Sequence, residues 1–156
     1  MKCFDNEIVI PFVGVGKIKL GMNYNDAIKV LKDNNIIYSM GIDPNKGCKP
    51  EMPWKKVYVK DYMTLWFAAD ILWQISFEGE YKGSLDNGIK IGISIDDAQI
   101  IDKDLVYDDW NEVWVSNKGY KLVDNVEFRI IIFSIFIKEV LDDDVFYSYQ
   151  WFKKYQ

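Results

Sequence analysis

The sequence predicts an α+β protein made of two similar units, each with a short strand, a glycine turn, a capped helix and antiparallel strands. Three observations support this prediction: an internal repeat, a helical apolar period after each glycine turn, and alternating apolar and polar residues beyond it. At 156 residues and 49% apolar composition, the chain can fill a sizeable core. We expect residues 1–83 to form the first repeat and residues 84–156 the second, in one compact domain with the helices on one face. Periodicity leaves open whether the strands form one continuous sheet or two packed sheets.

The internal repeat opens each unit. Residues 18–27 and 89–98 match at a constant separation of 71 positions, and both place a glycine between a short apolar strand and a polar helix start. The identical pairs are Ile18 and Ile89, Lys19 and Lys90, Gly21 and Gly92, Asp26 and Asp97, and Ala27 and Ala98. The two units are therefore expected to begin with the same local structure.

Asn23 is expected to cap the first helix, because its side-chain oxygen can accept a hydrogen bond from a free amide of the first turn. The helix should end near residues 34–35. Its apolar face is formed at helical spacing by Tyr24, Ala27, Ile28 and Leu31.

Ser94 is expected to cap the second helix in the same way. Gln99 and Asp102 stand where the first helix has two apolar residues, so the second helix should be shorter or more exposed. Its inward side chains are expected to be Ile95, Ala98, Ile101 and Leu105.

Strands should follow each helix. Turn-forming residues fill 36–56 and predict a loop there. The predicted strands are 57–59, 63–68 and 71–78 in the first half, and 112–115, 120–123, 126–132 and 133–140 in the second. Alternation within 71–78 predicts one buried face and one wetter face, the wetter one carrying Gln74 and Ser76. The nearly uniform apolar run 130–137 predicts a central strand covered on both faces.

Several kinds of catalytic and metal site are excluded. The chain has no histidine, which removes the usual serine and cysteine triads and most zinc sites. The Gly14-x-Gly16-Lys17 segment lacks the remaining residues of a dinucleotide fingerprint or a phosphate loop. The clustered aspartates lack the ligand alternation and central glycine of an EF-hand. We therefore expect a binding protein and not an enzyme, with no catalytic residues, no cofactor and no metal.

The charge pattern and the first residues of the chain indicate which partners and which cellular compartment to expect. The net charge is −5, and the basic pairs at 55–56 and 153–154 are too short for a nucleic-acid footprint. No uncharged run is long enough to span a membrane. The first residues do not form a secretory signal, and Cys3 and Cys48 are too few for a disulfide scaffold. A cytoplasmic location with free thiols is expected.

The segment from Asp96 to Glu112 is both acidic and aromatic. It holds seven acidic residues and one lysine, a net charge of −6, and its aromatic residues are Tyr107 and Trp110, with Trp114 beside it. Acidic groups steer a basic partner to a surface, and aromatic anchors then hold it by burial. The competing interpretation is that the aromatic residues fill the core and the acids only keep the protein soluble.

The opening from Ile18 to Leu31, repeated from Ile89 and followed by the aromatic hairpin 65–77, resembles small bacterial immunity proteins. These are cytosolic antidotes to secreted toxins, including those of contact-dependent growth inhibition. The opening is also similar to the repeat of BamE-type outer-membrane assembly lipoproteins, in which a Gly-Met turn starts the helix. The first resemblance implies a protein that binds the toxin domain, most simply a basic nuclease, and covers its active site.

The resemblance directs attention to the acidic residues, together with Trp110, as the partner-binding residues. These are Asp96, Asp97, Asp102, Asp104, Asp108, Asp109, Trp110 and Glu112, with a second candidate patch at Asp142, Asp143 and Asp144. Two alternatives stay open: a structural or assembly protein with a BamE-like repeat, and a small-ligand binder or enzyme whose pocket lies between the halves.

Overall fold

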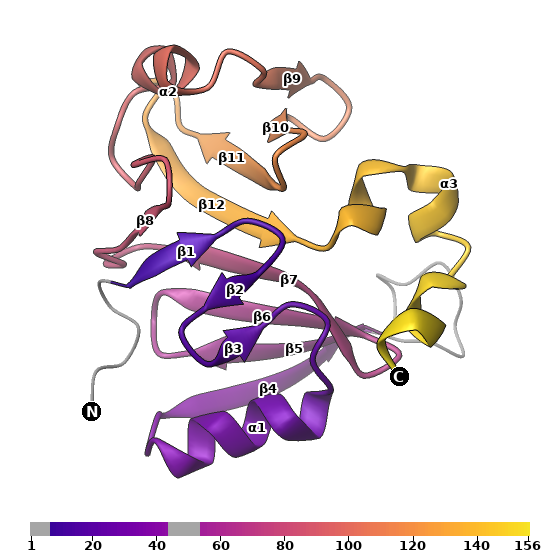
Figure 1. Ribbon diagram of the computed structural model, residues 1–156. Helices are drawn as coiled ribbons and strands as arrows, with labels where there is room; N and C mark the ends of the chain where they lie inside the picture. Colours follow the sequence, from indigo (N-terminus) through magenta and orange to yellow (C-terminus); the bar gives the residue numbers. More distant parts are fainter. Residues whose placement is uncertain (1–6, 44–53) are drawn as a thin grey trace.

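The computed structural model describes residues 7–43 and 54–156, and an antiparallel sheet of eight strands forms the centre of that part (Figure 1). In spatial order the strands are β4 (Tyr38–Asp43), β5 (Trp54–Val59), β6 (Met63–Ala68), β7 (Ile71–Glu78), β12 (Ile130–Phe136), β11 (Tyr120–Asp124), β10 (Val113–Ser116) and β9 (Val106–Asp108). The two halves of the chain therefore share one continuous sheet, and they meet where β7 pairs with β12.

A smaller sheet and two helices cover one face of the large sheet (Figure 1). The small sheet has the order β3 (Ile18–Lys19), β2 (Gly14–Val15), β1 (Ile8–Ile10) and β8 (Ser84–Leu85), and the helices are α1 (Tyr24–Asp33) and α2 (Ile95–Ile101). One cluster of buried side chains joins Val9, Leu31, Leu65, Phe77 and Ala98 from all of these layers. The predicted α+β class, with helices on one face, is confirmed.

The repeat is reproduced in backbone hydrogen bonds as well as in sequence. The Gly21 amide donates to the Leu72 carbonyl at 2.8 Å, and the Gly92 amide donates to the Ile130 carbonyl at the same distance. Both glycines have positive φ, +88° and +99°, which a residue with a Cβ rarely adopts. Each glycine turn thus attaches its helix to the first residues of the strand that lies at the centre of the sheet.

A pseudo-two-fold axis relates the two halves. The equivalent carbonyl acceptors Leu72 and Ile130 are 58 positions apart, and at this separation Ser76 of β7 corresponds to Ser134 of β12. These two residues pair directly across the seam, and their hydroxyl oxygens lie 2.8 Å apart. The axis therefore passes between the two serines, and the strand order on one side mirrors the order on the other.

The predicted helix starts are confirmed. The Asn23 side chain accepts from the Asn25 amide at 2.8 Å, and the Ser94 hydroxyl accepts from the Asp97 amide at 3.1 Å. The first helix ends at Asp33 and the second is shorter, as expected. The expectation that Ile101 faces inward is wrong, because 43% of this side chain is exposed where the short helix ends.

Two strand predictions need correction. The segment 36–56 was expected to be a loop, but β4 and the first residues of β5 lie within it; Cys48 and Cys3 fall outside the described residues. The expected strands 126–132 and 133–140 are one strand, β12. The Asn125 side chain accepts from two backbone amides, those of Glu127 and Arg129, and this turn leaves Phe128 67% exposed. Phe128 belongs to a turn and not to a strand.

A C-terminal segment follows β12 and packs beyond the covered core (Figure 1). It consists of three short turns of helix, η1 (Lys138–Leu141), α3 (Asp143–Phe146) and η2 (Trp151–Tyr155). Phe146 and Trp151 of this segment form a second buried cluster with Trp54 and Trp73 of the large sheet. Among the described helices, none combines the length and the apolarity that crossing a bilayer requires.

Candidate functional site

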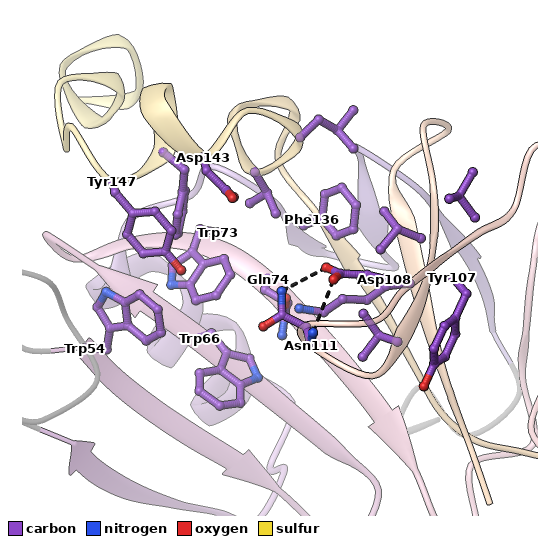
Figure 2. A pocket seen from close by; sticks show the side chains of 17 residues that line it. Trp54, Trp66, Trp73, Gln74, Tyr107, Asp108, Asn111, Phe136, Asp143 and Tyr147 are labelled. Carbon is purple, nitrogen blue, oxygen red and sulfur yellow. Dashed lines mark hydrogen bonds between the residues drawn. The ribbon is translucent and has the colours of Figure 1, made fainter.

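The face of the large sheet opposite α1 and α2 carries a groove. Strand pairing places Ser76, Ser134, Lys121, Val115 and Val106 in one row across neighbouring strands, all with side chains on this face. The groove has a volume of about 700 Å³, and the C-terminal segment forms its wall at one end (Figure 2). That size is typical of cavities that hold a small molecule or a protruding side chain.

A β-bulge directs an extra aromatic residue toward the groove. Trp66 pairs with Gln74, but Phe67 pairs with Leu72, so Trp73 is the additional residue on β7. Its ring centroid lies 4.9 Å from that of Trp54 and 6.1 Å from that of Trp66. Figure 2 shows these three indoles together at one end of the groove.

The C-terminal wall is held by aromatic contacts and one cap. The Phe146 ring stacks on Trp151 with an interplanar angle of 9°, and its centroid is 4.8 Å from that of Trp73. Asp142 caps α3 by accepting the amide hydrogen of Asp144 at 3.0 Å. This packing fixes the backbone that brings Asp143 to the groove.

A polar strip crosses the groove floor at the pseudo-two-fold axis. The Ser76 hydroxyl oxygen accepts from Trp66 Nε1 at 3.1 Å and from Gln74 Nε2 at 3.2 Å. Because both lone pairs of that oxygen are then used, its hydrogen is directed to Ser134. These hydrogen bonds fix the four side chains in place but leave Gln74 Oε1 without a partner among the described residues.

Three buried polar atoms along this end of the groove have no hydrogen-bond partner among the described residues. They are Trp54 Nε1, Trp73 Nε1 and Gln74 Oε1, and each parent side chain is at least nine-tenths buried. An unsatisfied buried donor or acceptor costs about 1–3 kcal/mol. Each such group in a folded protein needs an explanation, which can be local strain, a reactive role, or a bound water or ion.

Two charged side chains face each other across the groove: Lys121 on its floor and Asp108 on a wall. Burial lowers the pKa of Lys121 to about 8, and the Asp108 carboxylate opposes this shift only in part. Asp108 itself accepts from Asn111 Nδ2 at 2.9 Å and from the Trp110 amide at 3.0 Å, which lowers the pKa of its carboxyl group. Lys121 makes no hydrogen bond or ion pair within the described part of the chain, so its ammonium group is the weakly compensated charge of the groove.

The lowered pKa of half-buried Lys121 predicts an unusual alkaline pH dependence of stability. Between pH 8 and pH 10 the unfolded chain keeps the proton on Lys121 while the folded chain loses it, so the free energy of unfolding should rise with pH. We expect a gain of about 1–2 kcal/mol after allowing for the partial exposure of the side chain. Lys121→Met should remove this rise and stabilise the protein at pH 7, whereas Lys90→Met, at an exposed position, should do neither. Urea denaturation at stepped pH measures both, and an unchanged slope in Lys121→Met contradicts the assignment.

The structure brings two of the predicted acidic positions together. Asp108 at the end of β9 and Asp143 at the start of α3 line the same groove from opposite sides, although 35 positions separate them in sequence. Asp109, Glu112 and Trp110 lie in the turn beside Asp108, and Trp110 is 93% exposed. Asp108 and Asp143 line the groove, and Asp109, Trp110, Glu112 and Asp144 are their exposed neighbours in the chain. We call these six residues together the groove rim.

Other predicted positions lie elsewhere. Asp96 and Asp97 are exposed in the first turn of α2, on the covered side of the sheet. Asp104 is exposed and 3.6 Å from Lys118. These three carboxylates do not line the groove.

The prediction that Asp102 binds a partner is wrong, because its side chain is fully buried. The Ser116 hydroxyl donates to it at 2.7 Å, the Lys118 ammonium at 2.8 Å, and the Tyr120 hydroxyl donates a further short hydrogen bond. These donors lower the pKa of Asp102 to about 2 despite the desolvation that burial imposes, so the carboxylate is charged and serves the fold.

Sequence reasoning missed most of the groove. Strict alternation predicts Trp73 on the buried face, and no sequence marker indicates the bulge that directs it to the groove. Gln74 and Ser76 were placed on the wetter face, and they do lie on the groove side. A signal for Lys121 existed, since it alternates with apolar Tyr120 and Leu122 in a predicted strand, but its burial depends on the opposite wall.

Comparisons with known proteins bear on the fold. No protein-family model and no curated protein matches the sequence. Among solved structures, the chain is similar to the uncharacterized protein YfeY from Escherichia coli, with 13% sequence identity and a TM-score of 0.55 over 83% of this chain and 99% of that one. At such low identity the likeness concerns the fold alone, and it agrees with the α+β class.

Proposed function

We propose that the protein is a non-catalytic, cytoplasmic immunity protein that neutralises a basic toxin domain, most simply a nuclease, by covering its active site with the groove rim. The observation that carries this proposal is the convergence of Asp108 and Asp143, from two distant acidic segments, on one groove lined by aromatic side chains. Carboxylates placed in this way can occupy the sites where a nuclease holds phosphates.

The rim and the groove would have different parts in binding. Exposed carboxylates around Asp108 and Asp143 raise the association rate of a basic partner through long-range attraction. Trp110 projects almost fully into solvent, and a large exposed indole is the side-chain type that most often contributes strongly to a protein interface. The open groove beside it can then receive a protruding side chain of the partner.

The test is binding to the toxin domain encoded by the adjacent gene. The double variant Asp109→Lys/Asp143→Lys reverses charge on both sides of the groove at exposed positions that cap no helix. We expect the association rate at low salt to fall at least tenfold, because rim charges act mainly on association. The matched control, Asp96→Lys/Asp97→Lys, changes the net charge equally on the covered side of the sheet and should alter the rate less than threefold.

Surface plasmon resonance at two salt concentrations measures these rates. Equal effects of the two double variants would show that only net charge matters and would overturn the rim as the interface. A rim variant that binds at the unaltered rate would do the same. Thermal denaturation of each variant confirms that the fold is intact before binding is compared.

A further inference from the structure

Hydrogen-bond donors exceed acceptors on the groove floor. Trp54 Nε1 and Trp73 Nε1 are buried donors without a partner among the described residues, and Lys121 adds an ammonium group that makes no hydrogen bond there. The unpartnered acceptor is Gln74 Oε1, because the Gln74 amide nitrogen is committed to Ser76. The two indole nitrogens have almost no accessible surface, so the ammonium group of half-buried Lys121 is the one of these three donors that acceptors brought by an occupant can reach.

Nearby carboxylates do not supply those acceptors. Asp108 accepts three hydrogen bonds from its own turn, donated by the backbone amides of Trp110 and Asn111 and by the Asn111 side chain. Asp143 is exposed at the opposite wall and makes no ion pair with Lys121. Lys121 is thus left with attraction to Asp108 as its favourable electrostatic contact.

The walls determine the shape of an occupant. Trp66, Trp73 and Phe136 line the cavity (Figure 2); Trp66 is half-buried and the other two rings are almost completely buried. Planar rings bind well between aromatic side chains, and the carboxylate of a planar aromatic acid can pair with the ammonium group while its rings lie against the aromatic lining of the groove.

We propose that the groove floor is a binding site for a small planar aromatic carboxylate, which pairs with the Lys121 ammonium and stacks against the aromatic walls. This site is distinct in chemistry from the acidic rim, which attracts a basic protein. A neutral compound of the same shape gains the stacking without the ion pair. Binding of the acid should also keep the proton on Lys121, because a nearby anion favours the charged form of an amine.

Isothermal titration calorimetry of the full chain with naphthalene-2-carboxylate, without any protein partner, tests this proposal. At pH 6.5 we expect the carboxylate to bind at least tenfold more tightly than naphthalene-2-carboxamide. Lys121→Met should abolish that difference, while Lys121→Arg should retain it and extend it above pH 9, where wild-type Lys121 loses its proton. The control Lys90→Met removes the same charge outside the groove and should leave the difference unchanged.

Because no toxin is present, these measurements test the small-molecule site separately from the proposed immunity function. Equal affinity for the acid and the amide, or a preference for the acid that survives in Lys121→Met, would overturn the proposal. Indole N–H signals in heteronuclear NMR locate the ligand, because the Trp66 and Trp73 signals, assigned with Trp→Phe variants, should shift more than the signal of exposed Trp110. A shift confined to Trp110 would also overturn it.

Discussion

Asp102→Ala is expected to destabilise the protein by about 3–5 kcal/mol, a large part of the stability of a domain of this size. The substitution removes a fully buried carboxylate and leaves three donors, Ser116 Oγ, Lys118 Nζ and Tyr120 OH, without their shared acceptor. The Ser116 and Tyr120 hydroxyls are buried, and leaving buried donors unsatisfied costs far more than an exposed ion pair contributes, whereas the half-exposed Lys118 ammonium can be hydrated. Urea denaturation at pH 7 measures the loss.

Two comparisons separate burial from charge. Asp104→Ala removes an exposed carboxylate 3.6 Å from the same lysine and should cost less than about 1 kcal/mol. The carboxyl pKa of Asp102 is lowered from 3.8 to about 2, so its contribution is present above pH 4 and is lost as pH falls toward 2. That part amounts to about 2 kcal/mol, and an acid transition of equal size in Asp102→Ala and wild type would contradict this account.

Phe146→Ala is expected to release the C-terminal segment from the sheet. The Phe146 ring contacts Trp54, Trp73 and Trp151, and truncating a buried phenylalanine costs about 3–5 kcal/mol. The large core beneath α1 and α2 does not include this residue, so the loss should fall on residues 138–156 and spare the rest. Hydrogen exchange should accelerate in α3 and η2 while β7 and β12 keep their protection.

Val145→Ala is the matched control for this prediction. Val145 is the preceding residue of α3 but is 42% exposed, so its truncation should change exchange little. Because the segment carries Asp143 to the groove, Phe146→Ala should also weaken binding at the groove rim. Global unfolding in Phe146→Ala, with uniform exchange across the sheet, would contradict the separation of the two clusters.

Local chemistry made the repeat predictable. The glycine turns and the caps Asn23 and Ser94 depend on residues close in sequence, and the structure confirms both caps and the length difference between the helices. The repeat also held information about Asp102, which occupies the position of Leu31 in the first unit. Since Leu31 was expected in the core, its counterpart was a candidate for burial, but its negative charge favoured a surface assignment.

The groove could not be predicted because it depends on distant parts of the chain. Its walls come from β6, β7, β9 and the C-terminal segment, and no sequence period relates those elements. The bulge at Trp73 shifts one side chain against the alternation on which the strand prediction rested. The turn at Asn125 depends on local residues and is predictable in principle, because asparagine side chains commonly form such Asx turns. The strand prediction for 126–132 is wrong because it gives more weight to the β-propensity of the residues that follow.

The serine pair on the pseudo-two-fold axis occupies the position that a symmetric dimer interface would give to one residue and its copy. When two identical half-length chains associate edge to edge through antiparallel strands, each residue on the axis meets its own copy, as Ser76 meets Ser134. The molecule is thus organised like a two-fold homodimer whose two subunits belong to one chain. Because the halves are parts of one sequence, equivalent positions can differ: Leu31 is an apolar core residue and Asp102 a buried carboxylate.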